Sequence, residues 1–145
     1  MEDPYDLQRF VTAQDAGSTY RQALAELGDG AKRTHWMWFV FPQIAGLGQS
    51  LTARKYAITG IDEARAYLQH PVLGARLAEC ARTVAGLDGR TADQIFGGID
   101  ERKLHSSMTL FLRADPQQPV FQAVLDKYFA GVPDAATDRI LGGRG

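Results

Sequence analysis

Apolar residues recur at helical spacing through most of the chain, in short segments that are closed by capping residues. The clearest case follows His70-Pro71, where we expect proline at the first helical position. The inward arc of this segment consists of Leu73, Leu77, Cys80, Ala81, Val84 and Ala85. The pattern predicts an all-α fold, a single compact orthogonal bundle of about six to eight short helices.

The same reasoning gives the other expected helices. They are residues 5–14, a helix capped by Ser18 that ends before Gly28, a short one capped by Asp62, a turn from Thr91 to Phe96, a helix from Asp100 to about Arg113, one opened by Pro119, and a final turn capped by Asp134 that ends at Leu141. No repeat, low-complexity tract or interdomain linker separates them. We therefore expect one domain over residues 3–141 and a flexible tail at 142–145.

Composition narrows the class of protein. The chain has 145 residues, with 16 basic and 17 acidic side chains and a pI near 6.3. This balance argues against a strongly cationic nucleic-acid-binding protein, and we expect no sequence-specific nucleic-acid partner. The single cysteine, Cys80, cannot form a disulfide within the chain, which is typical of a reducing cytoplasm. Because no apolar run is long enough to cross a membrane and the first residues lack signal-peptide features, we expect a cytoplasmic protein without a membrane partner.

One segment departs from the amphipathic pattern because it is apolar on every side. It begins after Lys32 and holds both tryptophans, Trp36 and Trp38. An exposed run of this kind promotes aggregation, so it must be buried. Pro42 prevents the run from continuing as a helix or as a central strand. We favour a short central helix for it.

A glycine-containing turn, Gly46-Leu-Gly48-Gln-Ser50, follows this segment. Its backbone N–H groups are able to cradle an anion at the start of the next helix. The alternative is a turn whose glycines meet a need for positive φ, and the absence of a Walker or dinucleotide-binding motif favours that interpretation.

The second departure lies in the helix expected from Asp100. Lys103 and Ser107 project into its inward arc, which Leu104, Met108 and Phe111 define, while the outward face consists of Glu101, Arg102, His105 and Thr109. A lysine among apolar groups needs polar partners, because desolvating its charge costs about several kcal/mol. The partner is either Asp100, in a structural pair at i, i+3, or a ligand. Gln14 is a fainter case, either central on an apolar face or turning to solvent at a helix end.

Together these departures predict a pocket. Its expected residues are His35, Trp36, Trp38, Gln43, Gly46, Gly48, Ser50, Asp100, Lys103, Ser106 and Ser107. Rigid aromatic walls suit a base or a sugar, and a lysine with hydroxyls and loop amides suits a phosphate. We therefore expect a small phosphate- or ribose-bearing ligand, such as a nucleotide or an ADP-ribose-like compound. The alternative is that both tryptophans belong to the core.

Catalysis has little support in the sequence. His35 with Ser106 or Ser107 is the one arrangement of base and nucleophile that we find, and no nucleophile-elbow motif accompanies it. The three histidines and Cys80 lack metal-ligand spacing, so we expect no metal and no cofactor. Whether the protein is an enzyme, with hydrolysis as the reaction, stays open. The alternative function is a module for protein–protein interaction or homodimerisation built on the Trp-rich segment.

Several long motifs resemble a bacterial family. They are His35-Trp-Met-Trp-Phe-Val-Phe-Pro-Gln43, Gly46-Leu-Gly-Gln-Ser50, Tyr56-Ala-Ile58, the stretches Glu63 to Leu77, Lys103 to Phe111 and Phe121 to Leu141, and Ile95-Phe-Gly97. On these motifs the chain is identified as a member of the family catalogued as domain of unknown function 1810, from about Asp3 to Leu141. The resemblance implies a predominantly α-helical single domain and no particular activity. The label calpastatin circulates for this family, but nothing in the chain resembles a calpain-inhibitory repeat.

Two shorter stretches, Ala53-Arg-Lys-Tyr-Ala57 and Phe96-Gly-Gly-Ile-Asp100, are faintly similar to the NADAR family of ADP-ribose-linked N-glycosidases. The chain lacks the glutamate–histidine–tyrosine signature of that family at the matching place. No catalytic residue is therefore carried over from it.

Overall fold

The protein is described by a computed structural model that covers residues 2–143. Over these residues it is all-α, as the sequence predicts, and seven of its helices have eight residues or more. The α-helices are α1 (Gln8–Asp15), α2 (Thr19–Gly28), α3 (Met37–Val40), α4 (Leu51–Lys55), α5 (Ile61–Gln69), α6 (Leu73–Ala85), α7 (Ala92–Phe96), α8 (Gly98–Ala114), α9 (Pro119–Tyr128) and α10 (Ala135–Gly143). Of the expected tail, Gly142 and Gly143 belong to α10, and residues 144–145 lie outside the described residues.

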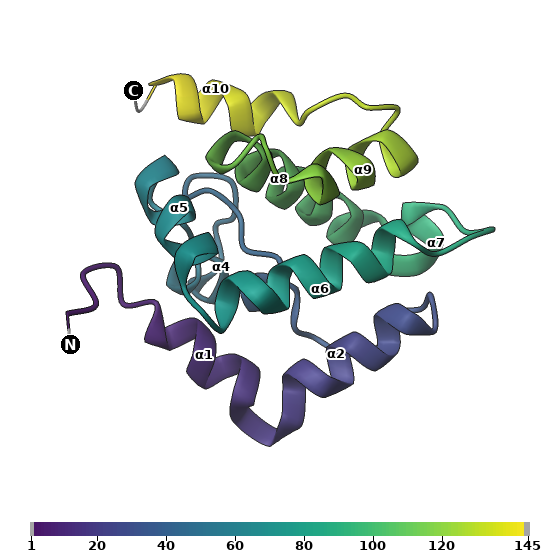
Figure 1. Cartoon of the computed structure of the whole chain (residues 1–145), viewed down its shortest axis with the longest axis horizontal. Helices are drawn as coiled ribbons and strands as arrows, with labels where there is room; N and C mark the ends of the chain where they lie inside the picture. Colours follow the sequence, from purple (N-terminus) through teal and green to yellow (C-terminus); the bar gives the residue numbers. More distant parts are fainter. Residues whose placement is uncertain (1, 144–145) are drawn as a thin grey trace.

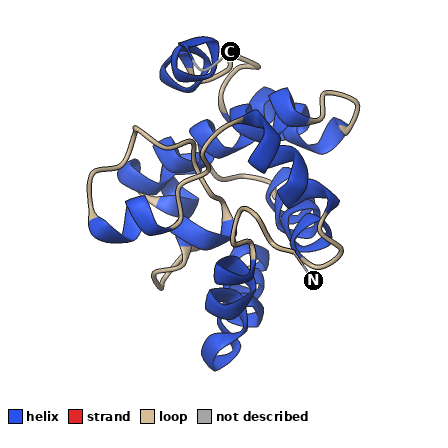
Figure 2. Ribbon diagram, turned by 90° about the vertical axis from the view of Figure 1, so that its left-hand side faces the viewer, coloured by secondary structure: helices blue, strands red, loops and turns tan. Residues whose placement is uncertain are grey.

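Two helices organise the bundle. α8 packs against α5, α7, α9 and α10, and α6 packs against α2, α5 and α9. In Figure 1, α6 runs across the middle, α10 lies above α8, and α1 and α2 form a V below. The ribbon of Figure 2 shows helices and loops only, and within residues 2–143 no helix is long and apolar enough to span a membrane.

The segment with both tryptophans is buried and forms the expected short helix. α3 is its helical part, and Trp36, Met37, Val40 and Phe41 are almost completely enclosed. A buried carboxylate from α2, Glu26, holds the start of this segment. It accepts hydrogen bonds from the backbone N–H groups of residues 33 and 34, from two side chains, and from the indole Nε1 of Trp36 at 3.1 Å.

Helix starts agree with the sequence where a side chain makes the cap. The Thr91 hydroxyl accepts from the Gln94 N–H in a complete capping box, and the Asp134 carboxylate accepts from the Thr137 N–H at 3.0 Å. His70 is also a helix-start residue, since its Nδ1 accepts from two backbone N–H groups. α6 nevertheless begins at Leu73, so the expectation of proline at its first position is wrong.

Ser18 stands at the N-cap of α2 as predicted but makes no cap hydrogen bond, and the predicted caps Asp62 and Asp100 are wrong. Ser18 lies in the left-handed region at φ 60° directly after Gly17 at φ 57°, and its hydroxyl makes no cap hydrogen bond. These two residues make the sharp corner between α1 and α2. Asp62 and Asp100 lie in the first turns of α5 and α8, whose N-caps are Gly60 and Gly97.

Two expectations about side-chain direction are settled by packing between helices. Gln14 is buried, and its Nε2 donates to the Phe39 carbonyl at 2.8 Å, so the interpretation that it turns to solvent is wrong. Thr109 was expected to face outward and is fully buried, because α10 and the segment before it cover that face of α8. His105 on the same face stacks on Phe129 and bonds the Val132 carbonyl at 2.7 Å.

Candidate functional site

Lys103 on α8 is neither free in solvent nor enclosed by packed core. Its side chain is 20% exposed, and its Nζ lies 3.5 Å from Asp100 Oδ1, so the expected i, i+3 pair is present. The same ammonium lies 4.7 Å from the centroid of the Trp38 ring. An aromatic face attracts a cation through its quadrupole, so Trp38 helps to hold Lys103 in place.

Asp100 has a second and closer cationic partner, Lys32, which the sequence did not reveal. Lys32 Nζ lies 2.8 Å from Asp100 Oδ2, donates to the Thr34 carbonyl, and lies over the Trp36 ring. Its side chain is only 6% exposed. Lys32 is therefore the more buried and more closely paired of the two cations, and Lys103 is the more accessible one.

Two surface hollows meet at Lys103. The first, which we call the Trp38 hollow, has a volume of about 380 Å³. It is lined by Lys32, His35, Met37, Trp38, Phe96, Gly97, Gly98, Ile99, Asp100 and Lys103. Four of the predicted site residues thus come together here, from the segment around α3 and from the first turns of α8. The N terminus of α8 lies at this hollow without a side-chain cap.

The second, which we call the Gln43 hollow, has a volume of about 330 Å³. It is lined by Gln43, Leu47, Gly48, Ile99, Arg102, Lys103, His105, Ser106, Asp134 and Ala136. Four predicted residues line it, and it shares Ile99 and Lys103 with the Trp38 hollow. The linear sequence gave no sign of Ile99, which is 74% exposed and separates the two hollows.

The remaining predicted residues do not line either hollow. Trp36 is fully buried in the core, so the expected aromatic wall of two tryptophans is reduced to Trp38. Ser107 is also fully buried, and its Oγ has no hydrogen-bond partner among the described residues. Ser50 accepts from the Ala53 N–H at 3.0 Å and caps α4.

Of the two glycines in this turn, Gly46 meets the expected need for positive φ, and Gly48 is required for space. Gly46 lies at φ 108°, a conformation that side chains rarely adopt. At Gly48, a Cβ atom would lie 2.5 Å from the Cβ of Ala53, so a side chain is excluded there by the start of α4. Ser50, as the cap of α4, already bonds one of the nearby N–H groups.

The hydroxyls near Lys103 are poorly placed for nucleophilic catalysis. Ser106 Oγ is 2.8 Å from the Thr137 hydroxyl, and Ser107 is enclosed. His35 lines the Trp38 hollow, whereas Ser106 lines the Gln43 hollow. The structure therefore does not join His35 to either serine. Within residues 2–143, no three His, Cys, Asp or Glu side chains are grouped so as to hold a metal ion.

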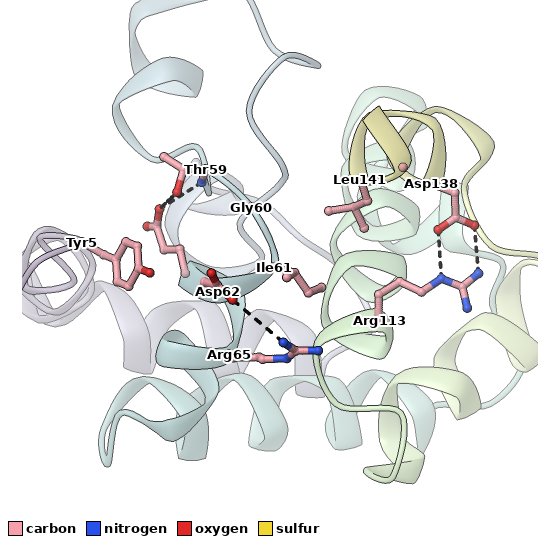
Figure 3. Close-up of a pocket in the computed structure, with 11 residues that line it drawn as sticks. Tyr5, Thr59, Gly60, Ile61, Asp62, Arg65, Arg113, Asp138 and Leu141 are labelled. Carbon is pink, nitrogen blue, oxygen red and sulfur yellow. Dashed lines mark hydrogen bonds and ion pairs between the residues drawn. The ribbon is translucent and has the colours of Figure 1, made fainter. Parts of the chain in front are cut away.

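A larger hollow lies elsewhere, between the start of α5 and the facing parts of α8 and α10 (Figure 3). Its volume is about 790 Å³, and no predicted site residue lines it. The two arginines around it already have carboxylate partners. Arg113 makes a bidentate salt bridge with Asp138 at 2.9 and 2.8 Å, and Arg65 Nη1 lies 3.9 Å from Asp62 Oδ1. Because three carboxylates, from Asp62, Glu63 and Asp138, line this hollow against two arginines, the smaller hollows at Lys103 are the stronger candidate for an anion.

Fold and site together define a small all-α protein with a lysine between two surface hollows. The family described as "Protein of unknown function (DUF1810)" matches residues 4–141, so the chain belongs to this family, as its motifs predicted. It is similar to the crystal structure, at 1.38 Å, of the conserved hypothetical protein Rv1873 from Mycobacterium tuberculosis. The two share 51% sequence identity with a TM-score of 0.93, over 97% of this chain and 99% of that one. A comparison with curated proteins finds no match.

Proposed function

We propose that the protein binds a small phosphate- or ribose-bearing anion at Lys103. One observation carries the proposal: Lys32 and Lys103 share a single carboxylate, and Lys32 holds it more closely, at 2.8 Å against 3.5 Å. One positive charge at the surface is thus left without a full counter-charge. An anionic ligand supplies that counter-charge through charge-assisted hydrogen bonds.

Trp38 contributes mainly by positioning this ammonium. Lys103 Nζ lies over its ring, so a planar group cannot stack on that face unless the lysine moves away. The phosphate is therefore the part of a ligand that meets Lys103, and rings or sugars lie beside it in the hollows. Binding, rather than catalysis, is the function we propose, because the nearby Ser106 hydroxyl already bonds Thr137.

The test is a binding titration by calorimetry with AMP, ADP, ADP-ribose and pyrophosphate. Lys103→Met is expected to lower the affinity of every ligand that binds by about tenfold or more, since it removes a charge-assisted contact. Lys127→Met is a matched control. Lys127 lies 3.5 Å from Asp88 and over the Tyr128 ring, but it lines none of the hollows at Lys103.

Two results would overturn the proposal. One is that none of the four compounds binds at millimolar concentration. The other is that Lys103→Met, with an unchanged circular dichroism spectrum and melting temperature, binds them as tightly as Lys127→Met does.

The exposed side chain of Ile99 favours a second candidate function, homodimerisation or docking of a partner protein. Ile99 is 74% exposed between two hollows, where a partner protein could bury it. Sedimentation of the ligand-free protein over a wide concentration range tests this alternative. A monomer at every concentration counts against homodimerisation, and a dimer that Ile99→Asp dissociates supports it.

A further inference from the structure

The geometry points to a ligand with two lobes joined by a pyrophosphate, which lies at Lys103 while one lobe occupies each hollow. This inference rests on the proposed function and specifies its ligand class. A nucleoside diphosphate that carries a second sugar has this form.

The first argument is the way in which α8 divides the surface. Ile99 and Lys103 are one helical turn apart, so they lie on the same face of α8. Both line both hollows, which makes the two hollows neighbours on either side of this pair. Each hollow, at about 380 and 330 Å³, is near the lower limit for a small-molecule pocket. A ligand with one lobe would fill one of them and leave the other open.

The second argument is the charge along the divide. Arg102 immediately precedes Lys103 on α8, lines the Gln43 hollow but not the Trp38 hollow, and makes no ion pair with any described carboxylate. Lys103 has only the longer contact to Asp100. Both cations line the Gln43 hollow, so they can meet the two charges of a pyrophosphate placed where this hollow borders the Trp38 hollow.

The third argument is the different chemistry of the two hollows. The Trp38 hollow has an apolar lining from Met37, Trp38 and Phe96, which suits the edge of a base beside the Trp38 face that Lys103 occupies. The Gln43 hollow offers the Gln43 amide and Asp134 Oδ1, which suit the hydroxyls of a sugar, whereas Asp134 Oδ2 and His105 Nε2 already bond Thr137 and the Val132 carbonyl. We therefore place the nucleoside in the Trp38 hollow and the second sugar in the Gln43 hollow.

The experiment compares ADP-ribose, which has both lobes, with ADP, ribose 5-phosphate and pyrophosphate, by calorimetry on the full chain. ADP-ribose is expected to bind about tenfold or more tightly than ADP, and pyrophosphate alone more weakly than either. Gln43→Ala is expected to reduce the affinity for ADP-ribose to that for ADP and to leave ADP binding unchanged. The backbone carbonyl of Gln43 accepts from the Ile58 N–H, and this contact does not depend on the side chain that is removed.

Ala136→Phe is a second variant, designed to fill the Gln43 hollow from α10. It should abolish the advantage of ADP-ribose over ADP and leave ADP binding intact. If wild-type protein binds ADP, or pyrophosphate, as tightly as ADP-ribose, the two-lobed ligand is wrong and the anion site at Lys103 stands. If none of these compounds binds, the proposed function and this inference both fail.

Discussion

Glu26 shows how a helical core of this size keeps a charge. Its side chain is fully buried, and hydrogen-bond donors surround both carboxylate oxygens. Burial by itself raises the pKa of the Glu26 carboxyl, but the hydrogen bonds from Thr34, Arg33 and Gln22 outweigh it and lower the pKa to about 2. The donors include the Trp36 indole, so this charge fixes the segment that leads to the candidate site.

The first prediction follows from that shift. The pKa falls from an ordinary 4.5 to about 2, which corresponds to about 3 kcal/mol of stability. Because the folded-state pKa is the lower one, this contribution is complete above about pH 4.5 and is lost as the pH falls towards 2. Glu26→Gln should therefore lower the free energy of unfolding by about 3 kcal/mol at pH 7, and the gap to wild type should narrow below pH 4.5.

Urea denaturation at a series of pH values measures both effects. The exposed Glu2 supplies the control, since Glu2→Gln should change the stability at pH 7 by no more than about 0.5 kcal/mol. A gap for Glu26→Gln that stays constant down to pH 2.5 would contradict this account of the buried carboxylate.

At the scale of elements, the approach of α5 to α6 depends on one glycine. A Cβ atom on Gly74 would lie 2.1 Å from the carbonyl oxygen of Leu68 and 2.9 Å from its carbonyl carbon. Both atoms are backbone, so the clash is relieved only by moving the helices apart. Gly74→Ala should therefore destabilise the protein by about 3 kcal/mol or more.

Gly28 is the control for this substitution. It is the last residue of α2, and nothing lies within 4 Å of the position of its Cβ. Gly28→Ala should leave the stability unchanged or raise it by about 0.5–1 kcal/mol, because alanine loses less backbone entropy in a helix. Thermal unfolding of the two variants tests the argument, and a melting temperature of Gly74→Ala equal to that of wild type would refute it.

The attachment of α10 to α8 gives a third prediction. The Thr137 hydroxyl donates to the Asp134 carboxylate and lies 2.8 Å from Ser106 Oγ. Asp134 and Ser106 line the Gln43 hollow, and Thr137 connects them. Thr137→Val preserves the shape but removes this buried link, so we expect a loss of about 1–3 kcal/mol. Hydrogen exchange should increase chiefly in α10. If the hydrogen-exchange rates of Thr137→Val increased as much in α6 as in α10, the idea that this link stabilises α10 locally would be contradicted.

Sequence reasoning predicted elements well where a side chain near in the chain fixed the local backbone. The Thr91 capping box and the proline that opens α9 are examples. It misplaced the starts of α5 and α8, because their N-caps are Gly60 and Gly97 and the acidic residues lie one turn further on. Gly97, at φ 82°, has a conformation that favours glycine, whereas Gly60 is extended at φ 175°, and neither carries a capping side chain that a pattern of residue types could reveal.

In the candidate site too, contacts between residues near in the chain were predicted and contacts made by tertiary packing were missed. The Lys103–Asp100 pair was visible because both residues are on one helix, three positions apart. Lys32 was missed because tertiary packing, not local spacing, brings it to Asp100. A helical wheel gives the direction of a side chain and not what covers it, so it placed Thr109 outward although α10 buries that face.

At the scale of the whole molecule, the two long helices tie the bundle into one unit. α5 and α9 each pack against both α6 and α8, so neither long helix can leave without exposing shared core. Arg9 adds a polar connection, because it pairs with the buried Glu63 at 3.0 Å and donates to the carbonyls of Lys55 and Ala57. We therefore expect α1 and α2 to unfold together with the rest.

Cys80 provides a probe of that cooperativity. It lies in α6 with no exposed surface, and its Sγ is 3.7 Å from the hydroxyl of Tyr20 on α2. Burial raises the pKa of the Cys80 thiol to about 12, so almost no thiolate is present at pH 8. A thiol reagent should therefore react with the native protein about a thousandfold or more slowly than with the unfolded chain. If the bundle opens as one unit, the logarithm of this reaction rate rises with urea concentration at the slope measured for global unfolding. A reaction rate that does not change with urea concentration would mean that α2 separates from α6 by itself.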